Sequence, residues 1–175
     1  MSRFAYADPP YLGMASRYAE QHPDALLWND PETHRDLIER LSRDYDGWAL
    51  SLHVPSLRTI LAMCPDDVVV MAWCKSWASW KPGVYPARAW EPVIIRGAAK
   101  RRWKNGDAQT PRDWCVTPAA MTGFFGAKPE PMVHWLLACL GVGPDDDFDD
   151  LFPGSGAVTR AWERWRSQMQ LGLGA

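Results

Sequence analysis

The chain has 175 residues, 47% of them hydrophobic, and a formal net charge of −2. This length and apolar content predict one compact domain (residues 1–175), and the near-neutral charge excludes an overall basic field for binding nucleic acid, so any such contact must be local. No apolar stretch is long enough to span a bilayer, no secretory signal pattern opens the sequence, and the four cysteines form no C-x-x-C pair, so we expect a cytoplasmic protein with no membrane contact and no metal site.

The first predicted strand, Phe4–Ala7, runs directly into the tetrapeptide Asp8-Pro9-Pro10-Tyr11. Neither proline can donate to a β-ladder, so the strand must end here, and each proline keeps the residue before it extended. The result is a rigid acidic corner at the carboxyl end of a strand, which is where ligands bind in open α/β sheets. For this tetrapeptide taken alone, an ordinary turn is the alternative.

The middle of the chain alternates between helical and strand patterns. After a long polar loop, apolar residues at helical spacing predict a helix from Thr33 to Tyr45, with Thr33 as its N-cap. A continuous apolar run at Asp66–Lys75 is typical of a strand buried on both faces. The other elements predicted here are a strand at Trp48–Val54, a short helix at Ser56–Cys64 and a strand at Ala89–Gly97.

The last part of the chain continues this alternation. We predict a helix at Pro129–Gly141, because proline stands in its first turn and glycine at its end. A strand at Asp146–Phe152 then leads through the loop Pro153-Gly154-Ser155-Gly156 into a final helix at Ala157–Met169. Because strands alternate with helices, we predict an α/β fold with a mostly parallel sheet and helices on both faces.

The glycine loop is the second candidate site. Its glycines allow close approach of the backbone to a ligand, and the helix that follows offers unpaired N–H groups. The loop lacks the Gly-Lys-Ser/Thr ending of a phosphate-binding loop, and Thr159 stands where a dinucleotide motif has its third glycine. The pattern favours a nucleoside-type cofactor, with a plain structural turn as the alternative.

Together, the two motifs resemble those of the amino methyltransferases of DNA and RNA that use S-adenosylmethionine. Asp8-Pro9-Pro10-Tyr11 matches their catalytic motif, and Lys128-Pro129 matches an element that lies beside the cofactor. The order of the motifs is the permuted order of the beta class and of the adenine-methylating family whose eukaryotic members modify messenger RNA. Lys75 and Glu91 match the facing ends of two central strands of that second family. The residues that match the cofactor loop are Asp150, Phe152, Gly154, Ser155 and Gly156.

The resemblance implies a Rossmann-like methyltransferase that transfers a methyl group to the exocyclic amine (N6) of adenine, in DNA rather than RNA. Asp8 and the Pro9 carbonyl accept hydrogen bonds from that amine, and Tyr11 stacks on the base. We expect Asp8→Ala to abolish methylation and to leave the fold intact. The implied cofactor-binding residues are Ala7, Asp8, Lys128, Pro129, Asp150, Phe152, Pro153, Gly154, Ser155 and Gly156.

Several alternatives stay open at this point: RNA as the substrate, N4 of cytosine as the acceptor, an inactive subunit of the same fold that binds nucleic acid, and a small nucleotide-binding oxidoreductase. Members of the family continue past the glycine helix into two more strands, whereas this sequence stops at LGLGA. The resemblance therefore implies a sheet shortened to five strands, and a homo- or heterodimer that completes the cofactor site.

Two segments combine basic and aromatic residues in a way that suits a phosphate backbone with stacked bases. In the first, Lys100, Arg101, Arg102 and Lys104 surround Trp103. The second begins at Lys75, the last residue of a predicted strand, and continues with Trp77, Trp80 and Lys81. A solvated loop is the alternative for the first segment, and core packing is the alternative for the tryptophans of the second.

Overall fold

The computed structural model describes residues 1–20, 23–78, 82–97, 111–119 and 126–172. These residues form one mixed sheet of six strands in the order β5-β3-β4-β2-β1-β6. The strands are β1 (Arg3–Ala7), β2 (Gly47–Ser51), β3 (Val69–Lys75), β4 (Trp90–Arg96), β5 (Trp114–Thr117) and β6 (Asp147–Asp150). β4 is antiparallel to β2 and β3, whereas the other three pairings are parallel, so the prediction of a mostly parallel sheet is confirmed.

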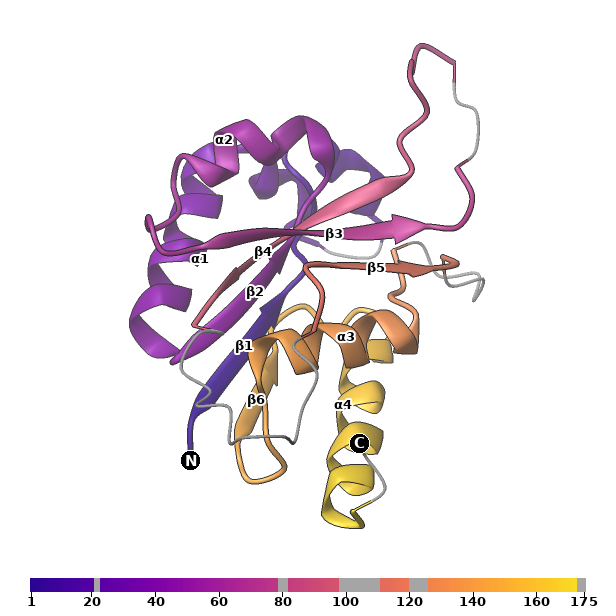
Figure 1. The fold of residues 1–175 in the computed structure, drawn as a ribbon. Coiled ribbons are helices and arrows are strands. Elements are labelled where there is room, and N and C mark those ends of the chain that lie inside the picture. Colours follow the sequence, from indigo (N-terminus) through magenta and orange to yellow (C-terminus); the bar gives the residue numbers. More distant parts are fainter. Residues whose placement is uncertain (21–22, 79–81, 98–110, 120–125, 173–175) are drawn as a thin grey trace.

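Helices cover both faces of the sheet, as predicted (Figure 1). The α-helices are α1 (Pro31–Asp44), α2 (Leu57–Leu61), α3 (Glu130–Leu140) and α4 (Ala157–Gln170), and short 3-10 helices lie at η1 (Ala15–Tyr18), η2 (Ala25–Asn29) and η3 (Val54–Ser56). One core joins α1 and α2 to the sheet and includes Leu41 and Trp48. The other joins α3 and α4 to the opposite face and includes Leu137 and Trp162.

The expected five-stranded sheet is wrong, because β5 adds an edge strand that the sequence did not signal. β5 has only four residues, and two of its side chains, Trp114 and Val116, are exposed. A segment this short at a sheet edge shows too little alternation to predict a strand. β5 is fixed instead by its pairing with β3, in which Ala72 faces Trp114.

Helix α1 begins earlier than predicted and has a different cap. The Asp30 side chain accepts a hydrogen bond from the Glu32 N–H at 3.0 Å, and Pro31 occupies the first helical position. Proline fits there because its missing N–H has no partner in the first turn. Thr33, the predicted cap, instead donates its hydroxyl to the Leu27 carbonyl at 3.0 Å.

The prediction that the valine-rich strand is buried on both faces is also wrong. Val69 at the start of β3 is 53% exposed, and buried side chains alternate with half-buried ones along the strand. β3 is one strand from the sheet edge. Among the described residues, no helix has the length and apolar content needed to cross a membrane.

Candidate active site

A cavity of about 400 Å³ lies where β1 and β6 end, and both candidate motifs line it. Of the residues predicted for the site, those that line the cavity are Asp8, Pro10, Lys128, Phe152, Pro153, Gly154 and Ser155. The cavity walls that the sequence did not predict are Tyr6, Tyr18, Gly126, Ala127, Leu151, Ala157 and Val158. The other predicted residues border the lining residues in the chain without lining the cavity themselves: Ala7, Pro9, Tyr11, Pro129, Asp150 and Gly156.

Strand pairing explains why motifs so far apart in the chain meet. β1 and β6 are parallel neighbours, with Tyr6 opposite Asp150. The Leu151 N–H donates to the Tyr6 carbonyl at 3.0 Å, so the pairing continues to the last residues of both strands. Each chain then leaves its strand at the same edge of the sheet, and Asp8 and the loop after Asp150 enter the same space.

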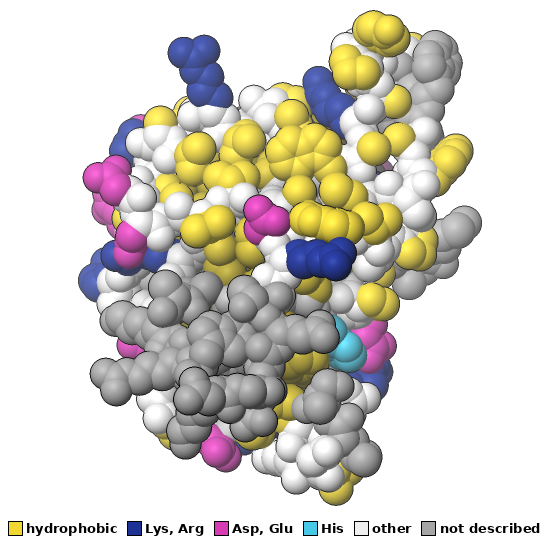
Figure 2. Space-filling model, in the orientation of Figure 1, with side chains coloured by type: hydrophobic (Ala, Val, Ile, Leu, Met, Phe, Trp, Pro, Cys, Tyr) yellow, Lys and Arg dark blue, Asp and Glu magenta, His cyan; other side chains and the backbone are white. Residues whose placement is uncertain are grey.

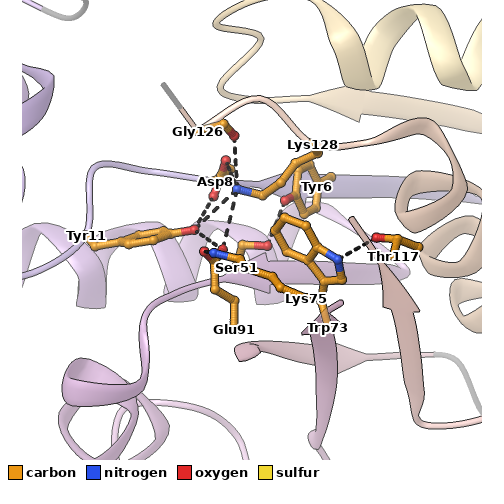
Figure 3. Close-up of polar contacts among 10 residues, drawn as sticks. All are labelled: Tyr6, Asp8, Tyr11, Ser51, Trp73, Lys75, Glu91, Thr117, Gly126 and Lys128. Carbon is orange, nitrogen blue, oxygen red and sulfur yellow. Dashed lines mark hydrogen bonds and ion pairs between the residues drawn. The ribbon is translucent and has the colours of Figure 1, made fainter. Parts of the chain in front are cut away.

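Both oxygens of the Asp8 carboxylate accept hydrogen bonds from other protein groups (Figure 3). Oδ1 accepts from the Tyr11 hydroxyl at 3.0 Å, and Oδ2 accepts from Lys128 Nζ at 2.5 Å. The Lys128 side chain is 3% exposed, and its ammonium also donates to the Gly126 carbonyl at 3.4 Å. Asp8 is therefore held in a fixed orientation by a buried cation and a buried hydroxyl.

A second acid, Glu91, extends this network. The Tyr11 hydroxyl also lies 3.1 Å from Glu91 Oε2, so its single proton can be given to only one of the two carboxylates at a time. Lys75 forms an ion pair with Glu91, and Lys128 Nζ lies 4.0 Å from Glu91 Oε2. The network thus contains two carboxylates and two ammonium groups, whose formal charges balance.

The β3 residue Trp73 packs against both cations of the network. Its ring centroid lies 5.1 Å from Lys75 Nζ and 5.8 Å from Lys128 Nζ, within the range of cation–π attraction. Its indole N–H donates to the Thr117 hydroxyl at 2.7 Å, which fixes the ring against β5. The unpredicted edge strand therefore supports the site indirectly.

Burial and charge shift the titration of these groups in different directions. Burial raises the pKa of Asp8 and outweighs the Lys128 ammonium, which lowers it. Burial also acts to raise the pKa of Glu91, but Lys128 and Lys75 together outweigh it, so the pKa of Glu91 is lowered. For Lys128, burial favours the neutral amine, yet Asp8 and Glu91 outweigh burial and raise its pKa. The ammonium form of Lys128 is therefore the one that the site holds.

The glycine loop has the backbone of a ligand cradle. Gly154 and Gly156 have φ values of +43° and +73°, a region that side chains rarely adopt. α4 begins immediately afterwards, and its first residues, Ala157 and Val158, line the cavity. Apolar walls, the start of a helix and a volume of about 400 Å³ fit a nucleoside-type cofactor.

Asp150, at the end of β6, leaves one acceptor beside this loop. Its Oδ2 accepts from the Thr159 hydroxyl at 3.0 Å, so the residue that replaces the third glycine of a dinucleotide motif has a structural partner. Its Oδ1 is buried and has no partner in hydrogen-bond geometry within the described part of the chain, although the backbone N–H groups of Phe152 and Thr159 act to lower the pKa of this carboxyl. A buried carboxylate oxygen of this kind suits a donor group on a ligand.

The ring of Tyr11 is more enclosed than base stacking requires. Tyr11 is 6% exposed, and its ring stacks on His53 with a centroid separation of 5.6 Å and an interplanar angle of 14°. Tyr18 meets it edge-on at 6.1 Å. In this conformation Tyr11 serves the site through its hydroxyl, and stacking of its ring on a base stays a prediction that requires His53 to move.

The residues predicted to contact nucleic acid fall into three groups. Lys75 pairs with Glu91 inside the network, where its side chain is 25% exposed. Trp77 is 76% exposed just beyond it. The remaining residues, Lys100, Arg101, Arg102, Trp103 and Lys104, lie outside the described residues, as do Trp80 and Lys81.

The sequence reasoning did not assign Glu91 or Tyr6 to the site. An acid that opens an otherwise apolar strand was the available signal for Glu91. Tyr6 gave no local signal, because an aromatic residue in a buried strand is ordinary. Its place at the cavity follows from the pairing of β1 with its neighbours, and its hydroxyl forms a hydrogen bond of 2.7 Å with that of Ser51 in β2.

Comparison with solved structures places this arrangement in a known fold. The complex of M1.HpyAVI with SAM has a TM-score of 0.53 and 16% identity, covering 93% of this chain and 78% of that one. M1.HpyAVI alone gives 0.53 and 14%, covering 93% and 75%. TTHA0409 from Thermus thermophilus, assigned as a DNA modification methylase and complexed with S-adenosyl-L-methionine, gives 0.51 and 18%, covering 93% and 77%.

No known protein family and no curated protein matches the sequence. The structural likeness, at these low identities, establishes the fold. The chain has the Rossmann-like α/β fold of these methyltransferases.

Proposed function

We propose that this chain is an S-adenosylmethionine-dependent methyltransferase that methylates the N6 amine of adenine in DNA. The observation that carries the proposal is the shared cavity, which brings the Asp8 carboxylate and the Gly154–Ser155 backbone together at the ends of β1 and β6. The fold of structures solved with this cofactor supports it. As further parts of this proposal, we predict that the motifs follow the permuted order and that a dimer completes the cofactor site.

The cofactor, when bound, supplies a methyl group on a positively charged sulfur. The backbone of Pro153, Gly154 and Ser155 faces the space where it would bind. Lys128, which with Pro129 directly precedes α3, also lines this cavity. Phe152 contributes an apolar surface to the same cavity. These residues fit a nucleoside with a charged tail better than they fit a phosphate group, because no free cation lines the cavity in the described residues; Lys128 is bound to Asp8.

The acceptor amine is a poor nucleophile, because its lone pair is delocalised into the base. Asp8 and the Pro9 carbonyl accept hydrogen bonds from its two N–H groups. These hydrogen bonds favour a pyramidal nitrogen with an available lone pair. Transfer of the methyl group would form the nitrogen–methyl bond as the methyl–sulfur bond breaks, and the fixed Asp8 carboxylate would stabilise the positive charge that develops on nitrogen. The surplus proton of the nitrogen would then pass to water.

Lys128 and Tyr11 act as positioning residues in this scheme. Each Asp8 oxygen has at most one protein donor and keeps a lone pair, so it can still accept from the substrate. A carboxylate fixed in this way spends no free energy on reorientation as the reaction proceeds. Burial, which raises the pKa of Asp8, also makes its ionised form a stronger hydrogen-bond acceptor.

Product analysis tests the proposal. The protein is incubated with methyl-labelled cofactor and with single- and double-stranded DNA and RNA, and each polymer is digested to nucleosides. The expected product is N6-methyladenine in DNA. Label in N4-methylcytosine or in RNA would correct the acceptor, and label in no polymer despite cofactor binding would identify an inactive subunit. Failure to bind the cofactor in calorimetry would overturn the proposal.

A further inference from the structure

The connection between β3 and β4, residues 76–89, forms an arm that projects beyond the sheet (Figure 1). The structure describes its residues 76–78 and 82–89. We propose that this arm clamps unpaired nucleobases beside the target nucleotide, with Tyr85 stacking on a base and Arg88 pairing with a phosphate. The inference rests on the proposed function for the identity of the substrate polymer.

The base of the arm is fixed to the candidate active site. The Lys75 N–H donates to the Ala89 carbonyl at 2.7 Å, which closes the arm where β3 ends. The Lys75–Glu91 ion pair lies at the same point and joins the network around Asp8. The base of the arm therefore lies beside the residues that orient the Asp8 carboxylate.

The described part of the arm exposes large aromatic side chains. Tyr85 is 100% exposed and Trp77 is 76% exposed, and space-filling atoms of hydrophobic side chains gather at the outer end of the arm (Figure 2). An exposed aromatic side chain is available for stacking, and base–aromatic stacking tolerates any sequence because every base has a π-face. Two such residues on one projection suit a single strand better than a duplex, whose bases are already stacked.

The charge of the segment suits a polyanion. Between Lys75 and Glu91 the sequence has no acidic residue, and the basic residue in the described part of this segment is Arg88. Arg88 is exposed. The pKa of His53 is lowered mainly by burial and then by the positive charge of Arg88. His53 stacks on Tyr11, so the positive charge of the arm reaches the residues next to Asp8.

Binding measurements on the full chain test the clamp. Anisotropy of a short fluorescein-labelled DNA strand, and of the matching duplex, is measured for wild type, Tyr85→Ala, Tyr85→Phe and Arg88→Gln. Leu171→Ala is the matched control, because Leu171 is 71% exposed at the far end of α4. Tyr85→Ala should weaken single-strand binding by about fivefold or more, since stacking contributes roughly 1–3 kcal/mol per base. Tyr85→Phe and Leu171→Ala should bind as wild type does.

Arg88→Gln should weaken binding to every strand alike and reduce the slope of log affinity against log salt by about one. Wild-type affinity in Tyr85→Ala, or no strand binding by wild type, overturns the clamp. If Tyr85→Ala instead dissociates a dimer in sedimentation and binds the strand normally, the arm is a protein interface and the inference is wrong.

The two proposals can fail separately. If the protein methylates DNA and Tyr85→Ala binds the strand with wild-type affinity, only the clamp is refuted. If Tyr85→Ala weakens strand binding but the wild-type protein does not bind the cofactor in calorimetry, only the proposed methyltransferase function is refuted.

Discussion

Asp8 has a structural partner as well as the chemical role proposed for it, and this changes what its removal should do. The sequence alone led us to expect that Asp8→Ala would leave the fold intact. In the structure Asp8 is the closest acid to Lys128, whose side chain is 3% exposed, while Glu91 lies 4.0 Å away. Removing one member of a buried ion pair leaves the other charge uncompensated, which is more costly than removing both.

We therefore predict that Asp8→Ala abolishes methyl transfer and also lowers the free energy of unfolding by about 3 kcal/mol. Asp8→Ala/Lys128→Met should recover part of that stability without recovering activity. Urea denaturation and a methyl-transfer assay measure the two effects. Wild-type stability in Asp8→Ala would show that Lys128 does not depend on Asp8, and activity in either variant would refute the proposed mechanism.

Glu91 gives a pH prediction at the same scale. Its pKa is lowered from an ordinary value of 4.5, since Lys128 and Lys75 outweigh burial. A carboxyl whose pKa is lower in the folded state stabilises the fold above its unfolded pKa and loses that contribution as pH falls through the folded pKa. Wild type should therefore exceed Glu91→Gln in unfolding free energy at neutral pH, and the difference should shrink as pH falls below about 4.5.

Denaturation curves over this pH range measure that difference. Glutamine is nearly isosteric with protonated glutamate, so the two proteins should converge in acid. A difference that stays constant with pH would mean that packing, and not the charge of Glu91, sets the effect.

At the scale of elements, the turn between β6 and α4 decides whether the cavity can hold a cofactor. The turn needs glycine at Gly156, where φ is +73° and an added Cβ would lie 2.8 Å from Arg160 Nη1. Gly172, just beyond the other end of α4, has a similar φ of +67° and open space around it. The two positions share backbone strain and differ in their distance from the cavity.

We predict that Gly156→Ala and Gly172→Ala each destabilise the fold by about 1–2 kcal/mol through the left-handed backbone. Only Gly156→Ala should weaken cofactor binding, by about tenfold or more, because the backbone strain at a φ of +73° falls in the turn that lines the cavity. Calorimetry and denaturation separate the two effects. Equal affinities in the two variants would show that the β6–α4 turn does not hold the cofactor.

The elements themselves were predicted unevenly. Helices with clear ends, such as α3 with Gly141 in the left-handed region at its carboxyl end, agree with the sequence prediction within a residue or two. α1 was placed too late because Pro31 was assigned to a loop, although proline opens helices readily. β5 was missed because four residues at an edge depend on pairing with β3, which local pattern does not report.

For the molecule as a whole, ligand binding should stabilise the fold. The cavity joins the ends of β1 and β6 to the starts of α3 and α4, so a bound cofactor would connect elements from both ends of the chain. At a concentration 100 times the Kd, a ligand that binds only the folded state adds about 2.7 kcal/mol.

The melting temperature should therefore rise by about 5–10 °C with S-adenosylmethionine at that concentration, given the usual shift per kcal/mol for a chain of this size. The Gly156→Ala variant should show a smaller rise. Thermal scans with S-adenosylmethionine, and separately with NAD, measure this rise in melting temperature. A shift with NAD and none with S-adenosylmethionine would favour the oxidoreductase alternative.

Local patterns are enough to predict the order of the main helices and strands, the acidic corner at Asp8-Pro9-Pro10-Tyr11 and the glycine loop. These follow from local rules, since proline and glycine restrict or free the backbone and apolar spacing reports the local pattern of burial. Local patterns do not predict that Asp8 binds Lys128, 120 positions away, or that Tyr11 reaches Glu91, 80 positions away. Such contacts depend on which strands pair and in what register, and that choice is made by the whole core together.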